Sequence, residues 1–185
     1  MIYVAEVKIQ GAHNLSNALA GACAAILGGA ALADVADVLR VFEGVADRQE
    51  IIREIDEVTY VNDTTATAPD AVVPALERFG KEKKVILIAG GVDKKLSYTR
   101  MCEGIVTYAK HLILFPGTAS DIIEPAVLGK VKIEHAHSMA EAVKKAAALA
   151  ERGDTVLLSP GGSSFNMFKN EFDRGDQFRE EVRNL

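Results

Sequence analysis

Short apolar runs alternate with amphipathic stretches from about residue 56 to the end of the chain. The apolar runs are rich in β-branched residues or leucine and are bounded by Gly, Pro or Asp; they lie at 58–63, 84–91, 111–117, 131–136 and 155–162. Such runs predict buried strands. Helical spacing is found between them, at 69–79, 97–109, 119–127, 138–152 and 165–183. Strands that alternate with helices predict an α/β fold with a mostly parallel sheet and flanking helices.

The first part of the chain has a different pattern. Residues 14–43 are rich in Ala, Leu and Gly and predict two helices, and residues 47–63 are charged and strand-like. Small residues on nearly every face of the first helix suit close packing inside a larger structure. Because this part offers little core of its own, we expect residues 1–55 to be the tail of a preceding domain and residues 56–185 to form a domain.

Composition limits the classes of function. The chain has 185 residues, a net charge of -5 and a pI near 5.4, which argues against binding to a nucleic-acid backbone. It has no long uncharged apolar stretch, and its first ten residues do not resemble a signal peptide. Cys23 and Cys102 lie in apolar helical contexts and are expected to be buried free thiols. We therefore expect a cytoplasmic protein.

Three of the five expected strands end in unusually polar segments. These segments are NDTTATAPD at 62–70, GGVDKKLSY at 90–98 and SPGGSSFN at 159–166. Each has an ordinary explanation when taken alone: a capped turn, a tight turn before solvated lysines, or a helix cap. In open parallel sheets, however, ligands bind beyond the carboxyl ends of the strands. Together the hydroxyls, the Lys94 ammonium and the helix N-termini favour the binding of carboxylates.

Other chemistries are poorly supported. GGVDKK at 90–95 lacks the spacing of a phosphate-binding Walker A loop, and Gly90 and Gly91 do not match a dinucleotide fingerprint. The chain has no G-x-S-x-G nucleophile elbow, and its four histidines have no evident nucleophile partner. A serine hydrolase is therefore not indicated.

Several motifs resemble those of the Mur ligase family, in the family's order and along the whole chain. GAHNLSNALAGACAA at 11–25 resembles the end of the family's central ATPase domain, and RQE at 48–50 resembles the arginine-containing element that follows it. The other stretches resemble the C-terminal domain of the members that add D-glutamate: YVNDTTATAPDA, LIAGGVDKKLSY, SMAEAV and, most specific, GDTVLLSPGGSSFNMFKNEFDRGDQF. The resemblance implies a Rossmann-like C-terminal domain at 56–185, preceded by a helical remnant of the central domain at 1–55.

The resemblance also implies residues that bind the acceptor D-glutamate. Lys94 matches the lysine that pairs with the α-carboxylate, and it is the residue expected to support catalysis, by positioning the amino acid. Thr67 matches a threonine near D-glutamate. Ser164 matches the serine that binds the side-chain carboxylate, helped by a backbone amide near Glu171.

A second set of matched residues is implied to contact ATP. Asn14 and Asn17, which follow His13 in the central-domain motif, match asparagines beside the adenine. Arg48 matches an arginine that approaches the nucleotide, and Asp63 matches an aspartate near the ribose.

Some positions depart from the family's pattern. Thr65 stands where the family often has lysine, and Asp47 stands where it usually has histidine. Gly161 and Gly162 replace an Ala-Cys or Ala-Ala type of pair. Glu171 and Phe172 invert the usual aromatic-then-acid order, although a backbone contact survives that change. The lysine's contact is therefore expected to be missing, and the geometry of the last loop is expected to differ.

The function implied is that of an ATP-dependent ligase. It joins D-glutamate to UDP-N-acetylmuramoyl-L-alanine in peptidoglycan synthesis, through acyl-phosphate and tetrahedral intermediates, and uses ATP and Mg²⁺ in the full enzyme. This sequence lacks the family's glycine-rich phosphate loop, its magnesium ligands and its UDP-binding domain. We therefore expect no metal site and no activity in this chain alone, and we expect the N-terminal and central ligase domains to be its partners.

Two alternatives stay open. The chain could be a stand-alone binding module or a partner subunit from a split ligase. It could also be a sibling ligase that adds a diamino acid or a folate-chain glutamate. Those siblings usually carry a D-x-x-R-P-like element on the loop that receives the amino acid, where this chain has SPGGSSFNMF at 159–168.

Overall fold

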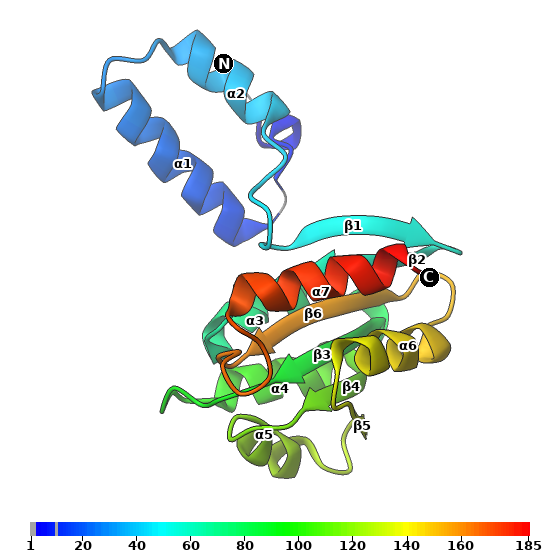
Figure 1. Ribbon diagram of the computed structural model, residues 1–185. Coiled ribbons are helices and arrows are strands. Elements are labelled where there is room, and N and C mark those ends of the chain that lie inside the picture. The colour runs from blue at the N-terminus through cyan, green and yellow to red at the C-terminus, as the bar shows by residue number, and fades with distance from the viewer. Residues whose placement is uncertain (1–2, 10) are drawn as a thin grey trace. The chain divides into compact units, whose positions relative to one another are not determined.

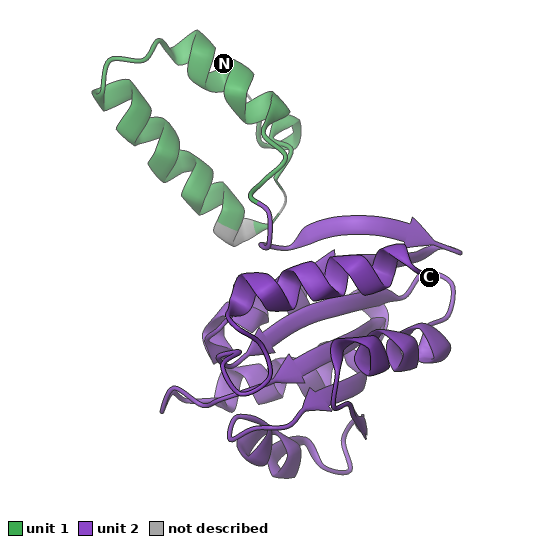
Figure 2. Ribbon diagram, viewed as in Figure 1, with its two compact units in different colours: residues 1–45 green, residues 46–185 purple. Residues whose placement is uncertain are grey.

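The chain forms two compact units. The computed structural model describes residues 3–9 and 11–185, without the side chains of residues 12 and 13. One unit comprises residues 1–45 and the other residues 46–185 (Figure 2). Residues 46–55, which the sequence pattern groups with the first segment, lie in the second unit. The assignment of residues 1–55 and 56–185 to two ligase domains remains a prediction.

The first unit contains the two helices that the sequence predicts. A short 3-10 helix, η1 (Val4–Glu6), precedes α1 (Ala12–Leu27) and α2 (Leu32–Val41). Several large apolar side chains of this unit are exposed, among them Leu19, Leu27 and Leu32. Cys23 on α1 is also exposed, so the expectation of a buried thiol there is wrong, whereas Cys102 in the second unit is buried. The large side chains on the same helix face, Leu19, Ile26 and Leu27, are themselves exposed, so that face of α1 is not covered in this unit.

The second unit is built on a six-stranded sheet with the order β1-β2-β6-β3-β4-β5 (Figure 1). The antiparallel pair β1 and β2 is joined by a two-residue turn, Asp56 and Glu57, which both have positive φ as hairpin turns require. The other neighbouring strands are parallel, which confirms the predicted mostly parallel sheet. The strand bounds are β1 Glu50–Ile55, β2 Val58–Asn62, β3 Val85–Gly90, β4 Ala109–Phe115, β5 Lys132–His135 and β6 Thr155–Gly161.

Helices cover both faces of this sheet (Figure 1). On one face, α3 (Pro69–Phe79), α4 (Thr99–Tyr108) and α5 (Ser120–Val127) pack in a core with Leu87, Leu112 and Leu157. On the other face, α6 (Met139–Leu149) and α7 (Glu171–Arg183) pack against Ile86, Ile113 and Val156. A short 3-10 helix, η2 (Lys81–Lys83), precedes β3. Within the described ranges, no helix is long and apolar enough to cross a membrane.

The last helix begins later than its sequence pattern predicts. Helical spacing starts at residue 165, but α7 begins at Glu171. Residues 165–170 instead form a turn in which the amides of Met167 and Phe168 both donate to the carbonyl of Ser164. The side chain of Asn170 then caps α7 by accepting from the amide of Asp173 over 2.9 Å. The residues after Ser164 are therefore a loop at the edge of the sheet.

Candidate functional site

The strand order brings the three polar strand ends together. Because β6 lies between β2 and β3, the loops after these three strands are neighbours at the carboxyl edge of the sheet. They are called here loop 1 (residues 63–68), loop 2 (residues 91–98) and loop 3 (residues 162–170). The plainer strand ends, after β4 and β5, lie farther along the sheet.

Backbone hydrogen bonds tie these loops to one another. The amide of Gly161, the last residue of β6 before loop 3, donates to the carbonyl of Ala66 in loop 1 over 2.8 Å. Val92 in loop 2 and Ser163 in loop 3 exchange two hydrogen bonds of 2.9 Å. Gly91 has a φ of +117°, and a Cβ there would lie 2.3 Å from the carbonyl oxygen of Ser163. Only glycine therefore allows loops 2 and 3 to approach this closely.

Two of the predicted acceptor residues are in direct contact. The ammonium of Lys94 in loop 2 donates to the hydroxyl of Thr67 in loop 1 over 2.7 Å. Lys94 is exposed and Thr67 is half-buried. Pro69, the first residue of α3, ends loop 1 just after Thr67, as its fixed φ favours. The pair thus presents a cation at the surface, held by a hydroxyl on the adjacent loop.

Ser164 in loop 3 is buried and its hydroxyl is unpartnered. The residue is 2 % exposed. Its Oγ is the single buried side-chain nitrogen or oxygen among the described residues that has no hydrogen-bond partner. Because buried polar groups almost always have partners, this hydroxyl calls for one. A ligand oxygen that accepts a hydrogen bond, such as that of a carboxylate, fits this need.

Glu171 is the first residue of α7 and lies next to loop 1. Its backbone carbonyl accepts from the hydroxyl of Thr64 over 2.8 Å. As a first-turn residue it has an amide without an intrahelical acceptor, and the helix dipole favours negative charge nearby. The inverted order of the acidic and aromatic residues at Glu171 and Phe172 changes side chains only, so the backbone amide of Glu171 keeps its position.

Asp63 is buried, and both of its carboxylate oxygens are engaged inside the protein. Oδ2 accepts from the hydroxyl of Ser159 over 2.7 Å, and Oδ1 accepts from the amide of Gln49 over 3.1 Å. Burial raises the pKa of Asp63 to about 7, against the effect of these two hydrogen bonds and of the nearby Arg48 and Arg78. A ribose contact at Asp63 would have to share or displace these bonds.

The remaining predicted nucleotide residues are divided between the two units. Arg48 is exposed and precedes β1. Asn14 and Asn17 lie on α1 in the first unit, where Asn17 is exposed. The side chain of His13 lies outside the described part of the chain.

The two departures from the family's pattern near loop 1 contact each other. Thr65, which stands in place of the usual lysine, donates its hydroxyl to the backbone carbonyl of Asp47 over 2.8 Å. Asp47, which stands in place of the usual histidine, is buried and accepts from Arg179 over 2.6 Å and from the side-chain amide of Asn62 over 2.9 Å. The changed residues are thus part of the packing between loop 1 and α7.

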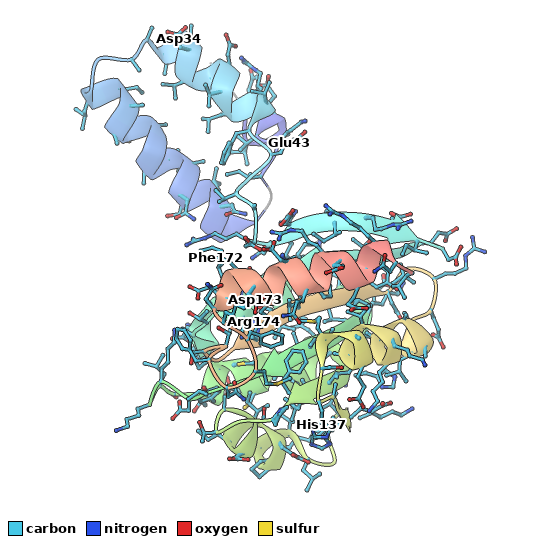
Figure 3. All side chains as sticks on the ribbon, viewed as in Figure 1. Asp34, Glu43, His137, Phe172, Asp173 and Arg174 are labelled. Atoms are coloured by element: carbon cyan, nitrogen blue, oxygen red, sulfur yellow. The ribbon has the colours of Figure 1, made fainter. Side chains whose placement is uncertain are left out.

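One residue to which the sequence pattern assigned no role is central to this packing. Arg174 on α7 is 1 % exposed and donates to both loop 1 and loop 3. Figure 3 shows it near the N-terminal end of α7, with Asp173 and Phe172. The surrounding sequence, EFDRGDQFREEVR at 171–183, reads as a solvated helix, so only the spacing to the buried Phe178 signals an inward position.

The arrangement suits the binding of an anionic ligand. Lys94 contributes a positive charge, Ser164 an unused hydroxyl and α7 the amides of its first turn. Within the described residues, no group of three or more His, Cys, Asp or Glu side chains is placed to hold a metal ion. The hydrogen-bond donors and the positive charge at the three loops are the groups that a carboxylate ligand requires.

The chain matches one protein family over most of its second unit. The family described as "Mur ligase, glutamate ligase domain" matches residues 47–162. Curated relatives are named UDP-N-acetylmuramoylalanine–D-glutamate ligase. The protein from Alkaliphilus metalliredigens is 38% identical over 186 residues, which cover 100% of this chain and 40% of the relative. The protein from Roseiflexus sp. is 40% identical over 184 residues, which cover 97% of this chain and 39% of the relative.

Solved structures share the fold. UDP-N-acetylmuramate-alanine ligase MurC from Thermotoga maritima has a TM-score of 0.69 at 21% identity, over 96% of this chain and 39% of that one. A pseudomurein peptide ligase type C from Methanothermus fervidus has a TM-score of 0.72 at 18% identity, over 96% of this chain and 37% of that one. The chain spans about 40% of the length of the curated relatives that it matches. By the family match and these relatives, the chain belongs to the Mur ligases, through their glutamate ligase domain.

Proposed function

We propose that this chain binds the acceptor D-glutamate of an ATP-dependent Mur ligase that acts in peptidoglycan synthesis. The observation that carries the proposal is the buried, unpartnered hydroxyl of Ser164, in the loop next to the Lys94–Thr67 pair. The names of the relatives specify D-glutamate as their amino acid. The family membership supports the reaction class, and the site chemistry supports the acceptor.

The two ends of the site suit a dicarboxylic amino acid. An ammonium has three donors, and Lys94 uses one of them on Thr67, which leaves donors for the α-carboxylate. The Ser164 hydroxyl and the first-turn amides of α7 would donate hydrogen bonds to the side-chain carboxylate. With both carboxylates held, the amine of D-glutamate is oriented for attack.

The reaction proposed for the complete ligase joins this amine to UDP-N-acetylmuramoyl-L-alanine. When bound, ATP with Mg²⁺ supplies the phosphoryl group that activates the carboxylate of that substrate. The residues of this chain contribute by positioning, an effect worth on the order of 7 to 11 kcal/mol at its upper end. Asn14, Asn17, Arg48 and Asp63 are proposed to contact the nucleotide. We propose that the enzyme works in the cytoplasm, together with the N-terminal and central ligase domains.

A titration with the two enantiomers of glutamate tests this function. Amide chemical shifts of the chain would be followed as D-glutamate is added, with L-glutamate as the control. Shifts that saturate with D-glutamate and centre on residues 63–67, 94 and 161–172 support the proposal. Equal responses to both enantiomers, or no response at millimolar ligand, contradict it.

A stand-alone binding module or partner subunit is the second candidate. The observation that favours it is that residues 46–185 contain a complete sheet with a core on each face, so the site has its own scaffold. Both candidates predict no ADP release by this chain alone. ADP release that appears when the missing ligase domains are added as a separate chain would identify a partner subunit.

A further inference from the structure

Arg174 is a buried cation that joins two loops of the proposed site. Its Nε donates to the hydroxyl of Thr64 over 3.0 Å, and its Nη2 donates to the carbonyl of Thr64 over 2.8 Å. Its Nη1 donates to the carbonyl of Gly162 over 3.3 Å. Thr64 belongs to loop 1 and Gly162 to loop 3. One rigid, planar group therefore holds both loops.

These two loops carry the two ends of the proposed acceptor site. Thr67, which holds Lys94, lies three residues after Thr64, and Ser164 lies two residues after Gly162. The hydroxyl of Thr64 also donates to the carbonyl of Glu171 over 2.8 Å, so the first turn of α7 is included in the same network. The position of Arg174 thus affects the separation between the α-carboxylate end and the side-chain carboxylate end.

The contacts of Arg174 differ from those of an ordinary structural ion pair. Among the described residues its hydrogen-bond partners are neutral oxygens, and Glu171, which has a favourable charge interaction with it, does not hydrogen-bond to it. Burial lowers the pKa of Arg174 to about 10, so the side chain remains charged at neutral pH. Burying a cation on neutral partners opposes folding, and an apolar side chain of similar size would avoid that penalty. The guanidinium, unlike an apolar side chain, fixes the position of loop 1 relative to loop 3 through its hydrogen bonds.

Another hydrogen bond also connects loop 1 to the residue that precedes loop 3, and comparison with it shows what the guanidinium adds. The amide of Gly161, immediately before loop 3, already bonds to the carbonyl of Ala66 in loop 1. A single hydrogen bond acts as a hinge, whereas the three bonds of Arg174 add a second point of attachment and fix the angle between the loops.

We propose that Arg174 is a positioning residue that sets the chain length of the dicarboxylic amino acid that the site accepts. This inference rests on the proposed function. It makes Arg174 a determinant of selectivity for glutamate over its shorter and longer homologues, although the side chain is buried below the site.

The test compares three D-amino acids that differ by single methylenes: D-aspartate, D-glutamate and D-2-aminoadipate. Dissociation constants would be measured by amide-shift titration of the 185-residue chain and of its Arg174→Lys and Arg174→Met variants. Lysine keeps the charge but lacks the planar fork. Phe178→Leu is the matched control, because Phe178 is fully buried on the same helix and lies in the apolar core. Urea unfolding of each variant reports stability separately.

The wild-type chain is expected to prefer D-glutamate to both homologues. Both Arg174 variants are expected to lose this preference by roughly tenfold, which is smaller than the ~100-fold loss that a 1 Å misplacement can cause in a catalysed reaction. Phe178→Leu is expected to lose stability and keep the preference. If Arg174→Met does not fold, Thr64→Val is expected to give a smaller drop in the same direction, because it removes one of the three bonds of Arg174 together with the hydroxyl's bond to the Glu171 carbonyl.

The outcomes separate this inference from the function on which it rests. Unchanged preference in folded Arg174→Lys and Thr64→Val overturns the inference and leaves the function standing. Preference lost equally in Phe178→Leu also overturns it, because general loosening would then explain the effect. No binding of any of the three amino acids by the wild-type chain contradicts the proposed function itself.

Discussion

The ammonium of Lys94 and the hydroxyl of Thr67 lie 2.7 Å apart, which joins the loops after β3 and β2. The residues are 27 positions apart in the sequence, and the order β2-β6-β3 makes their loops converge. The contact uses one of the donors of an exposed lysine and holds its charge at the carboxyl edge of the sheet. Loop 3, with the unpartnered Ser164 hydroxyl, lies between the two loops.

Replacing Lys94 is expected to weaken binding without weakening the fold. A hydrogen bond to a charged group contributes roughly 1.5 to 3 kcal/mol, so Lys94→Ala should raise the dissociation constant for D-glutamate by about 10- to 100-fold. Because Lys94 is exposed, the urea midpoint should stay unchanged. Lys95→Asn is the matched control, since Lys95 is also exposed and has a φ of 60°, which Asn tolerates. Equal weakening by both variants would mean that only net charge matters.

Ser164→Ala should separate stability from binding. The wild-type hydroxyl is buried without a partner, which opposes folding by about 1 to 3 kcal/mol. Alanine removes that group, so the free energy of unfolding should stay equal or rise, while binding of D-glutamate weakens. Urea unfolding and amide-shift titration measure the two effects. A loss of stability in Ser164→Ala would show that the hydroxyl has a structural partner. Ser163→Ala is the control, because it removes a neighbouring hydroxyl and keeps the two backbone hydrogen bonds between Ser163 and Val92.

The buried Asp63 predicts a pH dependence of stability. Its pKa is raised from 3.8 to about 7 in the folded state by burial, so the folded state binds more protons than the unfolded state between these values. The contribution of Asp63 to stability is therefore fully present below pH 3.8 and is lost as the pH rises through about 7. From pH 5 to pH 8, the wild-type chain should lose about 2 to 3 kcal/mol more than Asp63→Asn. Parallel stability curves of the two proteins would contradict the pKa shift.

Gly175 allows α7 to pack closely against the end of β2. A Cβ there would lie 2.4 Å from Oδ1 of Asp47 and 2.7 Å from Cγ2 of Thr64. Gly175→Ala should thus lower the free energy of unfolding, although alanine favours a helix by about 1 kcal/mol. Gly104→Ala on α4 is the matched control, because its Cβ would meet only the flexible end of Leu76 at 3.1 Å. Equal or higher stability of Gly175→Ala would show that α7 can move away without penalty.

The sheet and most helices could be predicted from the sequence, because their signals are local. Apolar runs of β-branched residues gave five strands, and Pro69 marked the first residue of α3. The pairing of strands is not local. That β6 lies between β2 and β3, and that β1 adds an antiparallel edge, depends on how the helices cover each face. The start of α7 was missed because Phe165, Met167 and Phe168 have helical spacing, yet Phe168 packs on Phe115 from a turn.

The site was only partly predictable. Hydroxyls, glycines and a lysine at strand ends indicated a carboxylate site, since such ends converge in parallel sheets. Apart from its helical spacing to Phe178, the sequence held no sign that Arg174 would be buried, because a charged residue among acidic neighbours usually faces solvent. Its three contacts are to groups more than ten positions away, which no local pattern encodes.

The most direct test is to observe the orientation of bound D-glutamate. Isotope-filtered nuclear Overhauser effects from ¹³C-labelled D-glutamate to the chain report which protein groups lie near each carbon. Contacts are expected from the α-proton to the side chain of Lys94 and the Thr67 methyl group, and from the γ-protons to the β-protons of Ser164. The reverse orientation, or contacts confined to other parts of the surface, would contradict a site in which Lys94 and Ser164 hold the two ends of the amino acid.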